Sequence, residues 1–112
     1  MNKNDIIRLQ HILNAARYAK LFATGRDRPD LDNDMMLTFA LTKAIEIIGE
    51  AATSISKDTR DQLSQFEWTK IIGMRNRLVH VYFQVDLDIL WDTVKKGIPE
   101  LIEKLEKIPE LN

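Results

Sequence analysis

The sequence of 112 residues has no cysteine and only two histidines, His11 and His80. Without cysteine the chain can form neither a disulfide nor a thiolate metal site, and the two histidines do not make a cluster with zinc-binding spacing. We therefore expect no metal and no cofactor. Any chemistry must come from histidine, carboxylate or hydroxyl groups.

The sequence also lacks any run of about eighteen apolar residues, and its first residues lead into an amphipathic pattern without the apolar core of a signal peptide. From this we expect a soluble, cytoplasmic protein that does not contact a membrane. The net charge of −1 argues against an extended basic surface for nucleic acid. A chain of 112 residues with 45% hydrophobic content can build one core and is too short for two, so we predict a single domain over residues 1–112.

Apolar residues recur at spacings of three and four along the chain, which is the pattern of amphipathic helices. The first helix is predicted to follow a cap at Asn4 or Asp5 and to end near Gly25. The second is predicted over about residues 33–55. Its candidate capping residues are Asp30, Asp32 and Asn33.

The second helix carries a broad apolar stripe that predicts packing against two neighbours. Interrupted by Lys43, the stripe consists of Met36, Phe39, Ala40, Ala44, Ile47, Ile48, Ala51 and Ile55. Gly49 is costly inside a helix and indicates that another helix comes close. Glu46 and Glu50 are four residues apart and could present two carboxylates for metal binding or acid–base work. Because the accompanying His-x-x-Glu spacing is absent, an exposed or dimer-facing acidic edge is the favoured interpretation.

A third helix is predicted to start at the capping-box spacing of Ser64 and Glu67. A fourth should begin at Asp86 and kink or split near Gly97-Pro99, since proline cannot donate a hydrogen bond to the preceding turn. No segment shows the sustained alternation of a strand. The predicted fold class is therefore all-α, an up-and-down bundle of four to five helices.

Polar residues suited to phosphate chemistry interrupt the third helix in the stretch Arg75-Asn76-Arg77-Leu78-Val79-His80-Val81-Tyr82. On a continuous helix Asn76 and His80 would share a face, with Arg75 about 100° away, so the three would line one wall. Since all three project from a single rod, a complete site needs a second wall. The residues alone leave an alternative open, in which the arginine and asparagine only satisfy carbonyls and end the helix.

The stretch from Arg75 to His80 resembles the arginine, four-residue spacer, histidine motif of HEPN domains, with asparagine directly after the arginine. Its continuation to Tyr82 resembles the HepT-type toxin subgroup. The likeness extends over nearly the whole chain, at matching relative positions. The segments that carry it are Ile48-Gly49-Glu50-Ala51-Ala52, Trp68 with Ile71-Ile72-Gly73-Met74-Arg75-Asn76, and Leu90-Trp91 through Pro99-Glu100-Leu101.

This resemblance implies a HEPN-like bundle and a metal-independent endoribonuclease that acts as a toxin, with a minimal nucleotidyltransferase as its antitoxin. It also implies a homodimer in which two motifs meet, in agreement with the need for a second wall. We expect the dimer contact along the third helix and its neighbours, where Gly49 and Gly73 allow close approach. The site residues expected are Arg75, Asn76 and His80 for catalysis, Lys70 and Arg77 for RNA-phosphate contacts, and Tyr82 for AMPylation by the antitoxin.

RNA supplies its own nucleophile, because the 2′-hydroxyl can attack the neighbouring phosphate. The protein must then move protons and stabilise charge, for which His80 and Arg75 are suited, while Asn76 can orient either group. DNA lacks the 2′-hydroxyl and should not be cleaved. Two alternatives are a non-catalytic nucleotide- or substrate-binding subunit of the nucleotidyltransferase, and a plain helical dimerisation domain. A buried internal ion pair at Arg75 would favour the latter.

Overall fold

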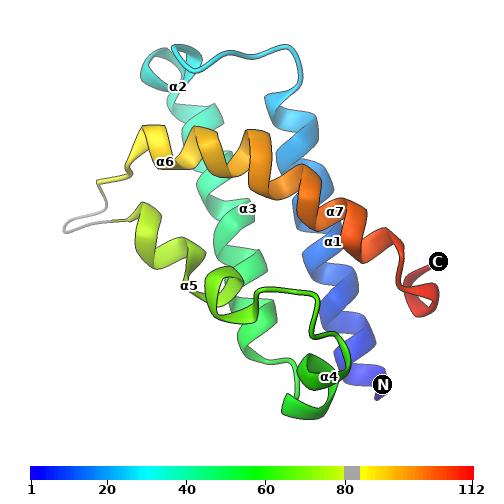
Figure 1. The fold of residues 1–112 in the computed structure, drawn as a ribbon. Coiled ribbons are helices and arrows are strands. Elements are labelled where there is room, and N and C mark those ends of the chain that lie inside the picture. Colours follow the sequence, from blue (N-terminus) through cyan, green and yellow to red (C-terminus); the bar gives the residue numbers. More distant parts are fainter. Residues whose placement is uncertain (80–83) are drawn as a thin grey trace.

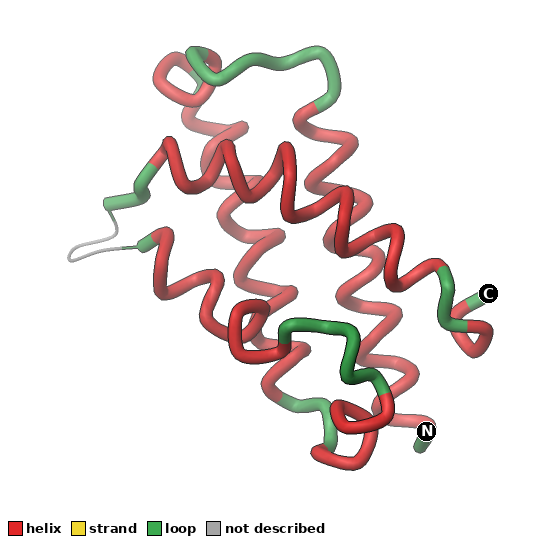
Figure 2. The backbone as a smooth tube through the Cα atoms, in the orientation of Figure 1, coloured by secondary structure: helices red, strands yellow, loops and turns green. Residues whose placement is uncertain are grey.

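The computed structural model describes residues 1–79 and 84–112, and this part of the chain folds into packed helices (Figures 1 and 2). The helices are α1 (Lys3–Ala23), α2 (Asp30–Asn33), α3 (Met35–Thr53), α4 (Lys57–Gln62), α5 (Trp68–Leu78), α6 (Leu87–Asp92) and α7 (Ile98–Glu106). Apart from an isolated bridge between Val79 and Val85, the described residues contain no β-structure. The predicted all-α fold is confirmed.

The long helices α1 and α3 run side by side in opposite directions, and α5 packs on the other side of α3 (Figure 1). The rod formed by α6 and α7 crosses over both α3 and α1. Between these helices lies the core, whose most deeply buried side chains include Leu9, Ile12, Leu41, Ile45, Ile48, Leu78, Leu90, Ile98 and Leu105. Among the described helices, none combines the length and apolarity needed to cross a membrane.

Three predicted helix starts are wrong by a few residues. The cap of α1 is Asn2, whose side chain accepts a hydrogen bond from the backbone N–H of Asp5 at 2.8 Å. The cap of α3 is Asp34, since the residues just before it form the separate turn α2. The capping box predicted for the third helix does not form, because α5 begins at Trp68 after Glu67, which makes no side-chain capping bond.

Asp5 is a buried carboxylate that connects α1 to α4. It accepts hydrogen bonds from the backbone N–H of Ser56 at 3.1 Å and from the Thr59 hydroxyl at 2.6 Å, and the Ser56 hydroxyl donates to it as well. Burial raises the pKa of Asp5, but the hydrogen bonds from Ser56 and Thr59, helped by Arg8, hold it below its usual value. The ionised form is therefore the one that the fold stabilises.

The apolar stripe predicted for the second helix is only partly buried. Helix α3 does pack on two neighbours, α1 and α5, but Met36 and Phe39 are 83% and 63% exposed. Exposed apolar side chains on α1 and α3 together number eight: Ile7, Tyr18, Leu21, Phe22, Met35, Met36, Phe39 and Ile47. We call these residues the α1–α3 apolar surface.

The irregularity predicted near Gly97-Pro99 takes the form of a π-helical segment, Thr93–Gly97, between α6 and α7. Pro99 lies in the first turn of α7, where its missing N–H is tolerated. Asp86 caps α6 as predicted, accepting a hydrogen bond from the backbone N–H of Ile89 at 3.0 Å.

Candidate active site

The predicted motif occupies the last turn of α5 and the residues after it. Buried Met74 and Leu78 anchor this turn, while Asn76 is exposed. The helix ends at Leu78, and Val79 is extended, with its N–H donating to the carbonyl of Arg75 at 3.0 Å. The helix that was expected to continue through the motif therefore ends at Leu78.

His80 and Tyr82 lie outside the described residues, so their predicted roles stay predictions. Asn76 makes no side-chain hydrogen bond within residues 1–79 and 84–112. Its predicted role in orienting a histidine or a phosphate also remains a prediction.

Arg75 faces α3, where its Nε lies 3.6 Å from Oε1 of Glu46. The two side chains are 43% and 28% exposed, so the ion pair lies at the surface of the bundle. A buried ion pair would have favoured a plain dimerisation domain. The observed pair is internal to the chain but accessible, which leaves the guanidinium open to a ligand.

Gly49 explains how α5 comes close enough to α3 for this ion pair. A Cβ built at Gly49 would lie 3.4 Å from the carbonyl oxygen of Ile72 and 3.7 Å from that of Ile71. The predicted close approach of another helix at Gly49 is confirmed, and that helix is α5 of the same chain. Glu46 is three residues before Gly49 and so lies on the same side of α3, beside Arg75.

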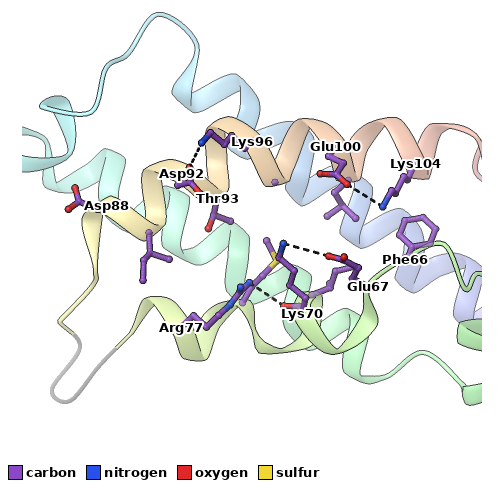
Figure 3. A pocket seen from close by; sticks show the side chains of 15 residues that line it. Phe66, Glu67, Lys70, Arg77, Asp88, Asp92, Thr93, Lys96, Glu100 and Lys104 are labelled. Atoms are coloured by element: carbon purple, nitrogen blue, oxygen red, sulfur yellow. Dashed lines mark hydrogen bonds and ion pairs between the residues drawn. The ribbon is translucent and has the colours of Figure 1, made fainter.

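Lys70 and Arg77 lie on the opposite side of α5. Arg77 follows Arg75 by two residues, which is about 200° around a helix, and lines a groove between α5 and the α6–α7 rod (Figure 3). Its Nη2 donates to the carbonyl oxygen of Lys70 at 3.4 Å, and Lys70 Nζ lies 3.6 Å from a carboxylate oxygen of Glu67. The structure thus separates the two predicted phosphate contacts from Arg75.

The groove has a volume of about 590 Å³ and an apolar floor that includes Ile71, Met74 and Leu101. Acids and bases alternate along its rim, with Lys96 3.1 Å from Asp92 and Lys104 3.3 Å from Glu100 (Figure 3). The charged lining residues are Lys70, Arg77, Lys96 and Lys104 with Glu67, Asp88, Asp92 and Glu100. Because the two signs balance, the groove has no net attraction for a polyanion.

Sequence reasoning did not identify the groove or the partner of Arg75. The groove could have been suspected from the acid–base pairs four residues apart near the end of the chain, Asp92 with Lys96 and Glu100 with Lys104. The position of Glu46 could have been suspected because Gly49, which indicates a close helix, follows it by three residues. The two-carboxylate interpretation of Glu46 and Glu50 is not supported by the arrangement, because Glu46 faces Arg75. In the described part of the chain, no three His, Cys, Asp or Glu side chains gather as a metal site would require.

Comparison with known proteins then decides the family. Residues 12–108 match the family described as "Ribonuclease HepT-like". The chain belongs to this family. The resemblance noted in the motif is therefore confirmed, the protein is an endoribonuclease, and RNA is its substrate class. Membership of a ribonuclease family argues against the alternative of a non-catalytic binding subunit.

Several relatives of this HepT-like ribonuclease cover most of its length. A protein of Caldanaerobacter subterraneus, provisionally named an RNase, is 38% identical over 100 residues, 89% of each chain. One from Methanocaldococcus jannaschii with a similar provisional name is 35% identical over 107 residues, 95% of this chain and 98% of its own. A Thermococcus cleftensis protein named "Probable ribonuclease HepT" is 43% identical over 75 residues, 67% of this chain and 68% of its own. No solved structure was found to match.

Proposed function

We propose that this ribonuclease is the toxin of a toxin–antitoxin pair and cleaves RNA in the cytoplasm without a metal ion, leaving a 2′,3′-cyclic phosphate. The observation that carries the proposal is the accessible guanidinium of Arg75, held at the end of α5 just before the motif continues to His80. A planar fork of N–H donors suits the non-bridging oxygens of a phosphate.

The chemistry is a transesterification. The 2′-oxygen forms a bond to phosphorus while the bond from phosphorus to the 5′-oxygen breaks, so one proton leaves the 2′-hydroxyl and another reaches the departing oxygen. Arg75 stabilises the negative charge that develops on the phosphorane. His80 takes or delivers a proton, as an imidazole can do near neutral pH, and in a dimer one His80 can act as base and the other as acid.

The test is cleavage of a defined RNA by the purified protein, with and without chelator, compared with His80→Ala. We expect chelator-resistant cleavage, cyclic-phosphate ends, an intact DNA control and a large loss in the variant. Undiminished cleavage by His80→Ala, or complete loss of wild-type activity in chelator, would contradict the proposal.

We also propose that the active form is a homodimer seated on the α1–α3 apolar surface. Gly49, expected at the interface, packs on α5 of the same chain, whereas a Cβ at Gly73 would meet nothing within 4 Å, so the predicted contact of a second copy at Gly73 stays a prediction. Phe39 and Glu46 are seven residues apart and lie on nearly the same side of α3. A second copy on the apolar surface would therefore border the Arg75 site and supply its missing wall.

Sedimentation tests the dimer directly. The wild-type protein should show twice the 13.0 kDa chain mass, and Phe39→Asp should give a monomer with little cleavage activity, because a charge would be buried in the apolar contact. A wild-type monomer with full nuclease activity would rule out a shared site.

Regulation is proposed at Tyr82, two residues after His80 in the sequence. We propose that a partner nucleotidyltransferase transfers AMP to its phenol, using ATP and magnesium held by the partner: the phenol oxygen forms a bond to the α-phosphorus of ATP, and pyrophosphate and the phenolic proton leave. The added phosphodiester is attracted to Arg75, and the nucleoside blocks the place of the RNA. Tyr82→Phe should keep cleavage activity yet escape neutralisation. Intact-mass measurement decides, since AMP additions that persist in the variant would place the modification elsewhere.

A further inference from the structure

Glu46 is the carboxylate that faces the proposed phosphate-binding arginine. Its Oε1 lies 3.6 Å from Arg75 Nε, across the contact between α3 and α5 that Gly49 makes close. An acid on the Nε side of a guanidinium leaves the two Nη groups to bind a phosphate. The helix contact therefore sets both where Arg75 sits and how its donors are turned.

Stability alone does not account for this pair. With side chains 43% and 28% exposed, it is screened by solvent, and ion pairs of this kind contribute little to folding. Nor does Glu46 attract the substrate, because its charge has the same sign as a phosphate. What the pair does supply is a restriction on a long, flexible side chain that must meet a transition state in one orientation.

We propose that Glu46 is a positioning residue for cleavage: it orients the Arg75 guanidinium toward the scissile phosphate and does not itself touch the RNA. This inference rests on the proposed role of Arg75. It predicts that loss of Glu46 lowers kcat without raising KM. Removing Glu46 frees Arg75 to move, which slows cleavage, and also removes a negative charge from the phosphate site, which does not weaken RNA binding.

The experiment compares Glu46→Ala, Glu46→Gln and wild type in RNA cleavage under steady-state conditions. For Glu46→Ala we expect kcat to fall roughly tenfold to a hundredfold, with KM unchanged or lower. Glu46→Gln keeps an acceptor oxygen and should recover part of the rate. A matched control is Glu103→Ala, which removes the same charge from an exposed site on α7 and should leave both constants unchanged.

A second background separates positioning from a structural effect. Arg75→Lys keeps the positive charge but loses the fork that Glu46 orients, so adding Glu46→Ala to it should cost little further activity. A general structural defect would lower the rate by the same factor in both backgrounds. Thermal unfolding and sedimentation of each variant should match those of the wild type.

The outcomes are distinct. A wild-type rate in Glu46→Ala, the same rate loss in both backgrounds, or a loss of thermal stability or dimer mass would overturn the positioning role and leave the ribonuclease site in place. Full activity in Arg75→Ala would instead overturn the proposed location of the phosphate site.

Discussion

On the α3 side of α5, Arg75 faces the Glu46 carboxylate at 3.6 Å, whereas on the other side Arg77 and Lys70 belong to a groove rim with as many acids as bases. Both arginines are in the last turn of one helix. Their surroundings differ because a helix turns side chains two residues apart to nearly opposite sides. Adjacent cations in a motif therefore need not share a site or a ligand.

The two sides also differ in how they are built. Gly49 has no side chain, so the backbone of α5 packs directly against α3. A side chain added at this position would therefore displace α5 and, with it, Arg75. The groove side is lined by long side chains in i,i+4 ion pairs, which adjust easily. A substitution should consequently have a larger effect on the α3 side.

The largest effect is expected from Arg75→Ala. Loss of a group that stabilises the charged transition state should lower the cleavage rate about a hundredfold to a thousandfold, or about 3–4 kcal/mol in barrier. Single-turnover cleavage measures it, with thermal unfolding to confirm an intact fold. An equal loss in Arg77→Ala would remove the distinction between the two sides of the helix.

Asp5→Ala, far from both sides, provides a reference for stability without a site effect. It should lower the free energy of unfolding by about 2–3 kcal/mol, since hydrogen-bond donors of Ser56 and Thr59 lose a buried partner. Urea unfolding measures this loss. In the Asp5→Ala background, the cleavage rate of Arg75→Ala relative to that of Arg77→Ala should be unchanged.

The same residue predicts a pH dependence. Because the folded-state pKa of Asp5 is lowered, its contribution to stability is fully present above the unfolded-state pKa of about 3.9 and is lost as pH falls through the lower folded value. The free energy of unfolding, measured from neutral to acid pH, should therefore fall steeply at the acid end. In Asp5→Ala that decline should be shallower, and an unchanged profile would assign acid sensitivity to other groups.

Gly49→Val tests the α3 contact. The added side chain meets carbonyl oxygens of Ile71 and Ile72, so overpacking should cost about 1–3 kcal/mol and shift α5. We expect cleavage to fall more than the loss of folded protein explains. Gly73→Ala is the control: its Cβ meets nothing within 4 Å, and the variant should keep its activity and gain up to about 1 kcal/mol.

The smallest effect is expected from Lys70→Ala and Arg77→Ala on the groove side. Each should raise KM by no more than about threefold, because these cations already face nearby acids. The dependence of log KM on log salt should change by less than about 0.7, the value for a full phosphate contact on single-stranded RNA. A larger change would restore these residues as true phosphate contacts.

Much of the fold, and the family, could be predicted from the helical periodicity and the motif. The helical bundle, the cap at Asp86, the irregularity before Pro99 and the close helix approach at Gly49 were all predictable, since each is signalled by a residue type or an apolar spacing within a short stretch of sequence. The start of α3 was missed by a few residues because several polar residues compete as caps within one loop, and those of α1 and α5 because another polar residue lies just before, or a capping box does not form, at the predicted start.

What the sequence alone determined is the helical class, the HepT-like motif and the family to which the chain belongs, because helix periodicity and motif spacing are local properties of the chain. Only the tertiary structure decided that Arg75 meets Glu46, that Arg77 and Lys70 face a different groove, and that Met36 and Phe39 stay exposed. Those outcomes depend on which sides of separate helices pack together. That choice is made by the whole core, in which Gly49 allows one close contact and buried side chains from distant segments set the others.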